Sequence, residues 1–356
     1  MQEPKQHFDL PFIARFTLLL VSTTCLLLLL YWGKLLFIPL FLAFLTAIFL
    51  YPAARLFERK HFGKSWAAVA SMLLFLVFVS VILFFFNSQF LQFLKALPEL
   101  KGKLDEGLKN AQSWVSNNYH VKLDPATGSV DSMIGKMASL AGTTLPIILE
   151  GLVLFVLFLF FSFYILYYRT RLENFILSLF KPTHKKKIRE IAVELRSVIN
   201  GYVKGLLLEM LIVTASSFFL LLILGIKYAL VMAVFAGVLN LVPYLGIYVA
   251  TAINTVLILA TADLTKGLEV AAVFIFVHVI DANVILPRVV GRSVKINPFI
   301  TLIAVLVGNL IWGVPGMFLF IPLTAILRVL GEKIKDFRSW AILIGEEEKE
   351  PIVKET

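Results

Sequence analysis

The chain has 356 residues, of which 59% are hydrophobic, and its formal net charge is +10. This apolar composition excludes an ordinary soluble domain and predicts an all-α, polytopic membrane protein. The basic residues lie in the gaps between apolar runs, a pattern typical of cytoplasmic membrane loops and not of a nucleic-acid-binding surface. The single cysteine, Cys25, excludes an intrachain disulfide.

Residues 1–90 contain three apolar runs, which we interpret as the first three spans of a scaffold. The predicted spans cover 16–32, 35–50 and 66–86. The gap between the second and the third is short and carries one acid against Arg55, Arg59, Lys60 and Lys64. The positive-inside rule therefore places this gap in the cytoplasm, together with the N-terminus.

Residues 91–144 form a long extramembrane segment in which apolar residues recur at helical spacing. We expect an extracytoplasmic amphipathic helical segment that covers the outer face or contacts neighbouring subunits. Residues 145–205 then contain a fourth span, at 145–168, and a strongly basic connector. Apolar residues share one helical face beneath the charges of 181–204, which predicts a helix in the cytoplasmic interface that binds anionic lipid. A solvated linker between two membrane units is the alternative.

The stretch from Tyr228 to Ala262 is apolar but is interrupted at 240–246. As helices its two arms would be roughly 18 Å and 24 Å long, whereas a hydrocarbon core is about 30 Å thick. We therefore predict a re-entrant helical hairpin. The pattern recurs between Pro298 and Leu330, where residues 311–316 interrupt a second apolar stretch. Pro-kinked helices that only pack, or two full spans in place of a hairpin, are the alternatives.

Each predicted hairpin follows a span, at 206–224 and 268–286, so residues 206–266 and 267–330 form two repeats before a cytoplasmic tail at 331–356. The loop with Arg288, Arg292 and Lys295 contains no acid and should be cytoplasmic, like the connector before residue 206. Residues 228–262 must then cross the membrane an even number of times. The prediction is about six spanning helices plus two inverted re-entrant hairpins, an arrangement that several secondary carriers use.

Ionisable side chains inside predicted spans are costly, which makes them candidates for a substrate or ion site. Asp281 shares a helical face with His278, and this pair could relay a proton or, with Asn283, supply ligands for a hard cation. The alternatives are an ion pair of Asp281 with Arg288 and a His278 that only packs. Glu209, one turn into the fifth span, receives a structural role.

Three asparagines in the interrupted apolar stretches are further candidates for binding a substrate or an ion. Asn240 and Asn309 lie at the two breaks, and Asn254 lies on the second arm of the first hairpin. Asparagines at such breaks could instead cap the helix ends, and capping is compatible with substrate contact.

Motifs for other chemistry are absent from the sequence, which contains no nucleotide-binding loop, nucleophile elbow or Cys/His metal spacing. We therefore predict that the protein is not an enzyme and uses neither a cofactor nor a metal site.

Three short motifs occur around the breaks and the acid. The first is Pro243, Tyr244, Leu245 and Gly246, and the third is Gly313, Val314, Pro315, Gly316 and Met317. The second contains Asp281, Ala282 and Asn283, followed by Pro287 and Gly291. Together with Ile38–Arg59 they resemble the autoinducer-2 exporter family, also called PerM-like permeases, best over residues 196–330. Asp281 and Ala282 stand where this family usually has Glu and Gly.

The resemblance implies an eight-segment permease of the bacterial inner membrane that forms a homo-oligomer, such as a pentamer. Some members export the quorum-sensing furanone signal, and others are sodium(lithium)/proton antiporters. The resemblance adds Pro243, Tyr244, Gly246, Gly313, Pro315 and Gly316 to the candidate binding residues, and Pro287 and Gly291 to the structural ones.

The sequence as a whole predicts a secondary transporter, with export of a small polar metabolite such as autoinducer-2 as the first hypothesis. A monovalent cation/proton antiporter that uses Asp281 is the second. A non-transporting envelope scaffold or lipid-binding protein is the third.

Overall fold

A computed structural model describes residues 11–85, 87–88, 91, 95, 102, 144–242, 245–261, 264–334 and 337–346. In this part of the chain every regular element is helical, apart from one isolated β-bridge between Ile296 and Gly345. The predicted all-α class is therefore confirmed. The extracytoplasmic segment predicted for 91–144 lies almost entirely outside the described residues.

Within the described residues, six helices are long and apolar enough to cross a membrane, so the chain is a multi-pass membrane protein. The number of candidate spans agrees with the prediction, but the helices that span are not all the predicted ones. The first apolar run, Phe16–Trp32, is among the shorter apolar helices, whereas the second arm of the second predicted hairpin is long enough to span. The six are Lys34–Arg59, Lys64–Phe85, Leu149–Ser178, Pro182–Ile223, Thr265–Val294 and Val314–Lys333.

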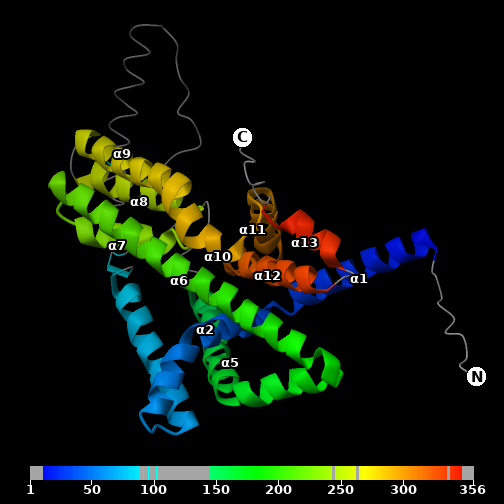
Figure 1. Ribbon diagram of the computed structural model, residues 1–356. Coiled ribbons are helices and arrows are strands. Elements are labelled where there is room, and N and C mark those ends of the chain that lie inside the picture. Colours follow the sequence, from blue (N-terminus) through cyan, green and yellow to red (C-terminus); the bar gives the residue numbers. More distant parts are fainter. Residues whose placement is uncertain are drawn as a thin grey trace, which may run out of the picture.

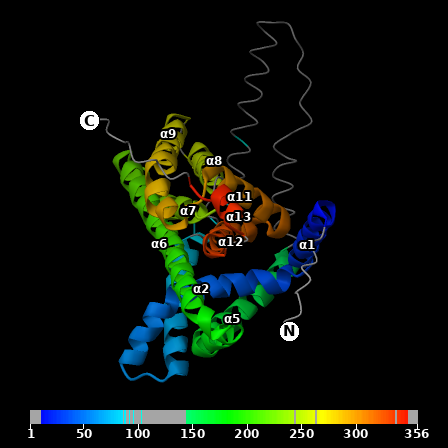
Figure 2. The ribbon, with the colours of Figure 1, turned by 45° about the vertical axis from the view of Figure 1, so that its right-hand side comes forward.

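The N-terminal half consists of α1 (Phe12–Trp32), α2 (Lys34–Arg59), a third span (Lys64–Phe85) and α5 (Thr144–Ser178). Gly33 alone separates α1 from α2. Ala47, Leu50 and Ala54 of α2 pack against Ala68 of the third span and Leu166 of α5. α1 projects away from the rest of the molecule in both views (Figures 1 and 2).

A single helix of 39 residues, α6 (Lys185–Ile223), follows a short 3₁₀ turn at Pro182–His184. The sequence interpretation divided this region at residue 205, but no helix end occurs there. At about 1.5 Å per residue α6 is roughly 58 Å long, so it exceeds the about 30 Å hydrocarbon core. α6 runs diagonally through the molecule, and the remaining helices are arranged along it (Figure 1).

Both apolar stretches are broken where the sequence predicts. α7 (Ala229–Leu239) and α8 (Leu245–Thr261) flank the first break, and α11 (Pro298–Trp312) and α12 (Val314–Lys333) flank the second at Gly313. Each pair packs as a helical hairpin. A β-carbon added to Gly316 would lie 1.9 Å from the Gly308 carbonyl oxygen, which shows how closely α11 and α12 approach. The second arm is longer than predicted, because α12 extends beyond Met317–Leu330 at both ends.

The two hairpins are connected by α9 (Leu264–Ile280), which continues through π-helical segments at Asp281–Ile285 and Pro287–Gly291 into α10 (Arg292–Val294). The predicted loop with Arg288 and Arg292 is therefore part of a continuous helix that ends at Lys295, where φ is +48°. After α12, a short helix α13 (Arg338–Ile344) packs against it. Residues 347–356 lie outside the described chain.

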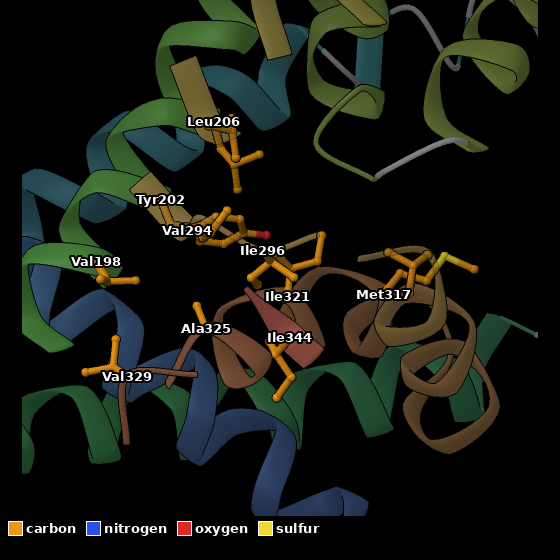
Figure 3. Packing of buried hydrophobic residues seen from close by; sticks show 12 residues of the cluster. Val198, Tyr202, Leu206, Val294, Ile296, Met317, Ile321, Ala325, Val329 and Ile344 are labelled. Atoms are coloured by element: carbon orange, nitrogen blue, oxygen red, sulfur yellow. The ribbon is translucent and has the colours of Figure 1, made fainter. Parts of the chain in front are cut away.

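The first half of α6 forms the largest buried cluster together with the second hairpin. Val198, Tyr202 and Leu206 of α6 face the side chains of α12, as Figure 3 shows. The hydroxyl of Tyr202 donates a hydrogen bond to the Phe318 carbonyl at 2.9 Å. The second half of α6 packs instead against α7, α8 and α9, where Leu221 and Phe274 are fully buried. The second hairpin therefore packs against the N-terminal half of α6, and the first hairpin packs against its C-terminal half.

Candidate functional site

Three elements meet at the side chain of Asn240, which lies at the C-terminal end of α7. Its Nδ2 donates a hydrogen bond to Oε1 of Glu209 on α6 at 2.9 Å and another to Oδ2 of Asp281 at 3.0 Å. An amide nitrogen carries two hydrogens, so both are used by the two carboxyl groups. We refer to Glu209, Asn240 and Asp281 as the acid–amide cluster.

Both acids of the cluster are buried, with 4% of each residue exposed. Oε2 of Glu209 and Oδ1 of Asp281 are also buried and have no hydrogen-bond partner among the described atoms. Neither acid forms an ion pair with a described residue, so an ion pair of Asp281 with Arg288 does not occur in this part of the chain. Arg288 is exposed instead. Two acids with unsatisfied oxygens in a membrane-buried setting can accept a proton or a cation.

Asp281 occupies the point at which α9 changes from α-helical to π-helical geometry. Single π-helical turns inside α-helices are frequent at functional sites, because the wider turn redirects one side chain. Pro287 and Gly291 bound the second π-helical segment. Pro287 has no N–H to donate to the helix, which is consistent with the irregular geometry there.

His278 lies one turn before Asp281, as the sequence predicts, and its ring contacts the ring of Tyr248 on α8 at a centroid distance of 5.2 Å. The buried Nδ1 of His278 has no hydrogen-bond partner among the described atoms. His278 therefore brings a third titratable group to the neighbourhood of the cluster, although no hydrogen bond joins it to Asp281 in the described chain.

Three other predicted amides lie apart from the cluster. Asn254 is fully buried, and its Nδ2 approaches the Met232 carbonyl at 3.4 Å, which ties α8 to α7. Asn283 is exposed and donates to the Val279 carbonyl of its own helix at 2.7 Å. Asn309 is exposed near the end of α11, where its carbonyl accepts from the Gly313 amide at 2.9 Å. The structure thus brings Asn240 and Asp281 together and leaves Asn283 and Asn309 outside.

The residues of the breaks determine how closely the arms approach. Gly246 faces the backbone of Leu239, whose carbonyl oxygen a β-carbon would approach to 1.7 Å. Gly313 has φ +65° and ψ −143°, a conformation that is essentially restricted to glycine. Gly316 is buried against Gly308, and Pro315 is exposed in the first turn of α12. Pro243 and Tyr244 lie outside the described residues.

Sequence reasoning assigned Glu209 a structural role, whereas the structure places it in the cluster. A signal was present, because an uncompensated acid inside a predicted span is unusual. Its partner could not be found from sequence, since Asn240 is 31 residues away and neither helical nor strand periodicity relates the two positions.

The two breaks also reach one cavity of about 490 Å³. Leu241, which follows Asn240, lines it together with Pro315 and Phe318 of α12, and the other described walls come from α2, the third span, α5 and α6. Thr46 is the one polar residue among those that line this cavity. The polar cluster and the cavity are therefore different features.

Residues 20–336 match the family described as "AI-2E family transporter". The chain belongs to this family. Two relatives are named putative transport proteins. YhhT of Escherichia coli strain K12 is 24% identical over 320 residues, 86% of this chain and 87% of YhhT, and YrrI of Bacillus subtilis strain 168 is 31% identical over 132 residues, 37% of each chain. The "AI-2 transport protein TqsA" of E. coli K12 is 25% identical over 127 residues, 36% of this chain and 37% of TqsA.

As an AI-2E family transporter the protein is not an enzyme, which agrees with the lack of catalytic motifs in its sequence. The resemblance to autoinducer-2 exporters is confirmed over most of the chain. The family match includes the acid–amide cluster and both hairpins, so the cluster lies within the part of the chain that relatives share.

Proposed function

We propose that this protein is a secondary transporter in which the acid–amide cluster binds a proton or a monovalent cation and couples it to movement of a small polar solute. One observation carries the proposal, namely that Asn240 donates to two buried acids from two other helices. An ion bound between these acids would neutralise charge that is otherwise costly inside a membrane. Its binding and release would change how firmly the first hairpin is held against α6 and α9.

We further propose that both hairpins are re-entrant and enter the membrane from opposite sides. The two ends of the first hairpin are adjacent, since Nζ of Lys266 at the start of α9 donates to the Leu224 carbonyl at the end of α6 at 3.0 Å. The base of the second hairpin is joined to α13, because the Asn297 amide, just before α11, donates to the Ile344 carbonyl at the end of α13 at 2.9 Å, and α13 in turn packs against α12.

The position of each base along α6 supports the inverted arrangement. The base of the first hairpin lies at the C-terminal end of α6, through Leu224. The base of the second lies beside the N-terminal half of α6, where a β-carbon on Gly201 would contact the side chain of Ser293 at 2.6 Å. Helix ends in the middle of a membrane are found where solute and ions bind in inverted-repeat carriers. The basic residues near the start of α6 support a cytoplasmic location for this end, and we propose that both termini lie on the same side.

The transported solute in the first hypothesis is a signalling metabolite such as autoinducer-2, moved outward. The name of the relative TqsA and the family match support this choice. The second hypothesis is sodium or lithium exchange for protons, which the pair of buried acids favours, because two carboxyl groups are suitable ligands for a hard monovalent cation. The homo-oligomer implied by the resemblance stays a prediction, which light scattering of the detergent-solubilised protein would measure.

The two hypotheses can be separated in proteoliposomes that contain a pH-sensitive dye. Addition of sodium or lithium should dissipate an imposed pH gradient for an exchanger, whereas labelled autoinducer-2 should move for an exporter. Glu209→Gln and Asp281→Asn keep side-chain size and remove one acid each, so either should reduce flux at least about tenfold. The matched control is Glu190→Gln, which removes an exposed acid from the same helix as Glu209.

Assembly is checked by size-exclusion chromatography of each variant. Unchanged flux in both cluster variants would contradict the coupling role of the acids. Lack of any flux by the wild-type protein, with either substrate, would favour the third hypothesis of a non-transporting envelope protein.

A further inference from the structure

The apolar cavity of about 490 Å³ extends between α2 and α6 and is also lined by residues of the third span and α5. Its volume falls within the range of about 300–1,000 Å³ that is typical of ligand pockets. Leu42 and Phe49 of α2, Leu154 of α5 and Val203 of α6 are among the described residues that line it. A polar solute would find almost no hydrogen-bond partner here, so the expected occupant is a hydrocarbon chain.

Two arginines lie beyond one end of this cavity, both over the ring of Tyr51 on α2. The guanidinium carbon of Arg196 is 4.4 Å from the ring centroid, and that of Arg169 is 5.3 Å from it. Arg169 is ion-paired with Glu58, whereas Arg196 forms no ion pair with any described residue. One carboxylate thus compensates two guanidinium groups, which leaves a surplus positive charge beside Tyr51.

Helix geometry connects these arginines to the cavity walls. Arg196 precedes Val203 by seven residues, about two helical turns and about 10 Å along the same face of α6. Arg169 follows Phe158 by eleven residues, about three turns and about 16 Å along the same face of α5. One leaflet of a hydrocarbon core is about 15 Å thick, so a chain anchored at these arginines would reach the cavity.

We propose that the cavity holds an acyl chain of an anionic phospholipid whose phosphate is bound by Arg196, with Arg169 beside it. An arginine binds phosphate through a planar pair of N–H donors, and its stacking on Tyr51 keeps those donors at the edge of the groove. The lipid belongs to the leaflet at the basic end of the molecule, where α2 ends and α6 begins.

The proposed lipid site is a single groove, whereas the interfacial helix predicted from the sequence would bind anionic lipid along its basic face. The chain of the bound lipid would contact Leu241 and Pro315, which lie at the two breaks. A lipid there would support both hairpins at once and set how easily they move. This last consequence depends on the proposed function, whereas lipid binding itself does not.

Native mass spectrometry of the full-length protein in detergent, titrated with phosphatidylglycerol, tests the site without a transport assay. Arg196→Ala removes the headgroup contact, and Leu154→Trp fills the cavity from α5. Each should weaken the tightest lipid-binding step by about fivefold or more. Should Leu154→Trp fail to fold, Val79→Phe fills the same cavity from the third span.

Two matched controls separate this site from general binding to the membrane-facing surface. Arg171→Ala removes an arginine that also lies over a tyrosine, Tyr168, but on the exposed face of α5. Leu152→Trp adds the same bulk as Leu154→Trp at a leucine that is 55% exposed. Both controls should bind lipid as the wild type does.

Equal affinity in all four variants would overturn the proposal. A loss in Leu154→Trp with unchanged binding in Arg196→Ala would overturn the headgroup assignment and leave the cavity to a neutral chain. Because the readout is lipid mass, either result is independent of whether the protein transports a solute.

Discussion

The side-chain nitrogen of Asn240 lies 3.0 Å from Oδ2 of Asp281, although 41 residues separate the two positions. This hydrogen bond joins the end of the first arm of one hairpin to the helix that leads into the other. Since the same nitrogen also donates to Glu209, a displacement of the hairpin by a few ångströms would expose or separate both acids. The proposed transport cycle requires a second arrangement of this cluster, and such a displacement would supply it.

The first prediction concerns the shared donor. Asn240→Leu keeps the approximate volume but leaves both buried carboxyl groups without their amide, so the free energy of unfolding should fall by at least about 1 kcal/mol. Thermal unfolding of the detergent-solubilised protein measures this as a lower Tm. Asn283→Leu is the control, because Asn283 is exposed and bonds only to its own helix. Equal Tm values for the two variants would show that the cluster does not hold the hairpin.

The second prediction concerns the close approach of the second hairpin. In Gly316→Ala the new methyl group would meet the Gly308 carbonyl oxygen, a backbone atom that cannot rotate away. We expect α11 and α12 to be forced apart, at a cost of about 1–3 kcal/mol.

Gly151→Ala provides a control of opposite sign. No described atom lies within 4 Å of a β-carbon at Gly151, and alanine is the better helix former, so this variant should be stabilised by up to about 1 kcal/mol. A Gly316→Ala variant that is also stabilised would contradict the tight packing.

The sequence was sufficient for the helices and for both breaks, because these depend on local composition. Apolar runs of about twenty residues, and a Pro or Gly within them, determine where helices form and end. The length of α6 was harder to predict, since its basic first half is amphipathic and its second half largely apolar, yet no residue between the two halves stops a helix. α12 is longer than predicted for a similar reason. Val314 and Pro315 do not stop a helix at this position, because a proline is compatible with the first helical turn.

Two of the three residues of the acid–amide cluster were predicted from the sequence as binding residues. Asn240 and Asp281 were found because a polar group within an apolar run is conspicuous at any distance from its partner. Their pairing with each other and with Glu209 depends on how α6, α7 and α9 cross, which residue spacing does not encode. Asn309 lies near the second break, as Asn240 lies at the first, yet Asn309 is exposed, so the tips of the two hairpins differ in their polar contacts.

The third prediction concerns the side of the membrane on which the hairpins begin and end. In a variant without Cys25, cysteines introduced at Lys227 and Thr265, both exposed, should react with a membrane-impermeant thiol reagent from the same side. Cysteines at Lys186 and Ser339, also exposed, should react from the opposite side. Labelling of Lys227→Cys and Thr265→Cys from different sides would mean that residues 228–262 cross once, which contradicts a hairpin.

The fourth prediction concerns the contact that holds the second hairpin against α6. The hydroxyl is the one polar group of the Tyr202 side chain, and it donates to the carbonyl of Phe318, which lies in the second turn of α12. Tyr202→Phe keeps the ring, which lies 5.8 Å from the ring of Phe318, and removes only this hydrogen bond. Hydrogen bonds between membrane helices contribute about 0.6 kcal/mol on average and up to about 1.7 kcal/mol, so a modest fall in Tm is expected. Tyr164→Phe, at a residue that is 47% exposed, should leave Tm unchanged, and a smaller effect at Tyr202 than at Tyr164 would exclude a stabilising role for this contact.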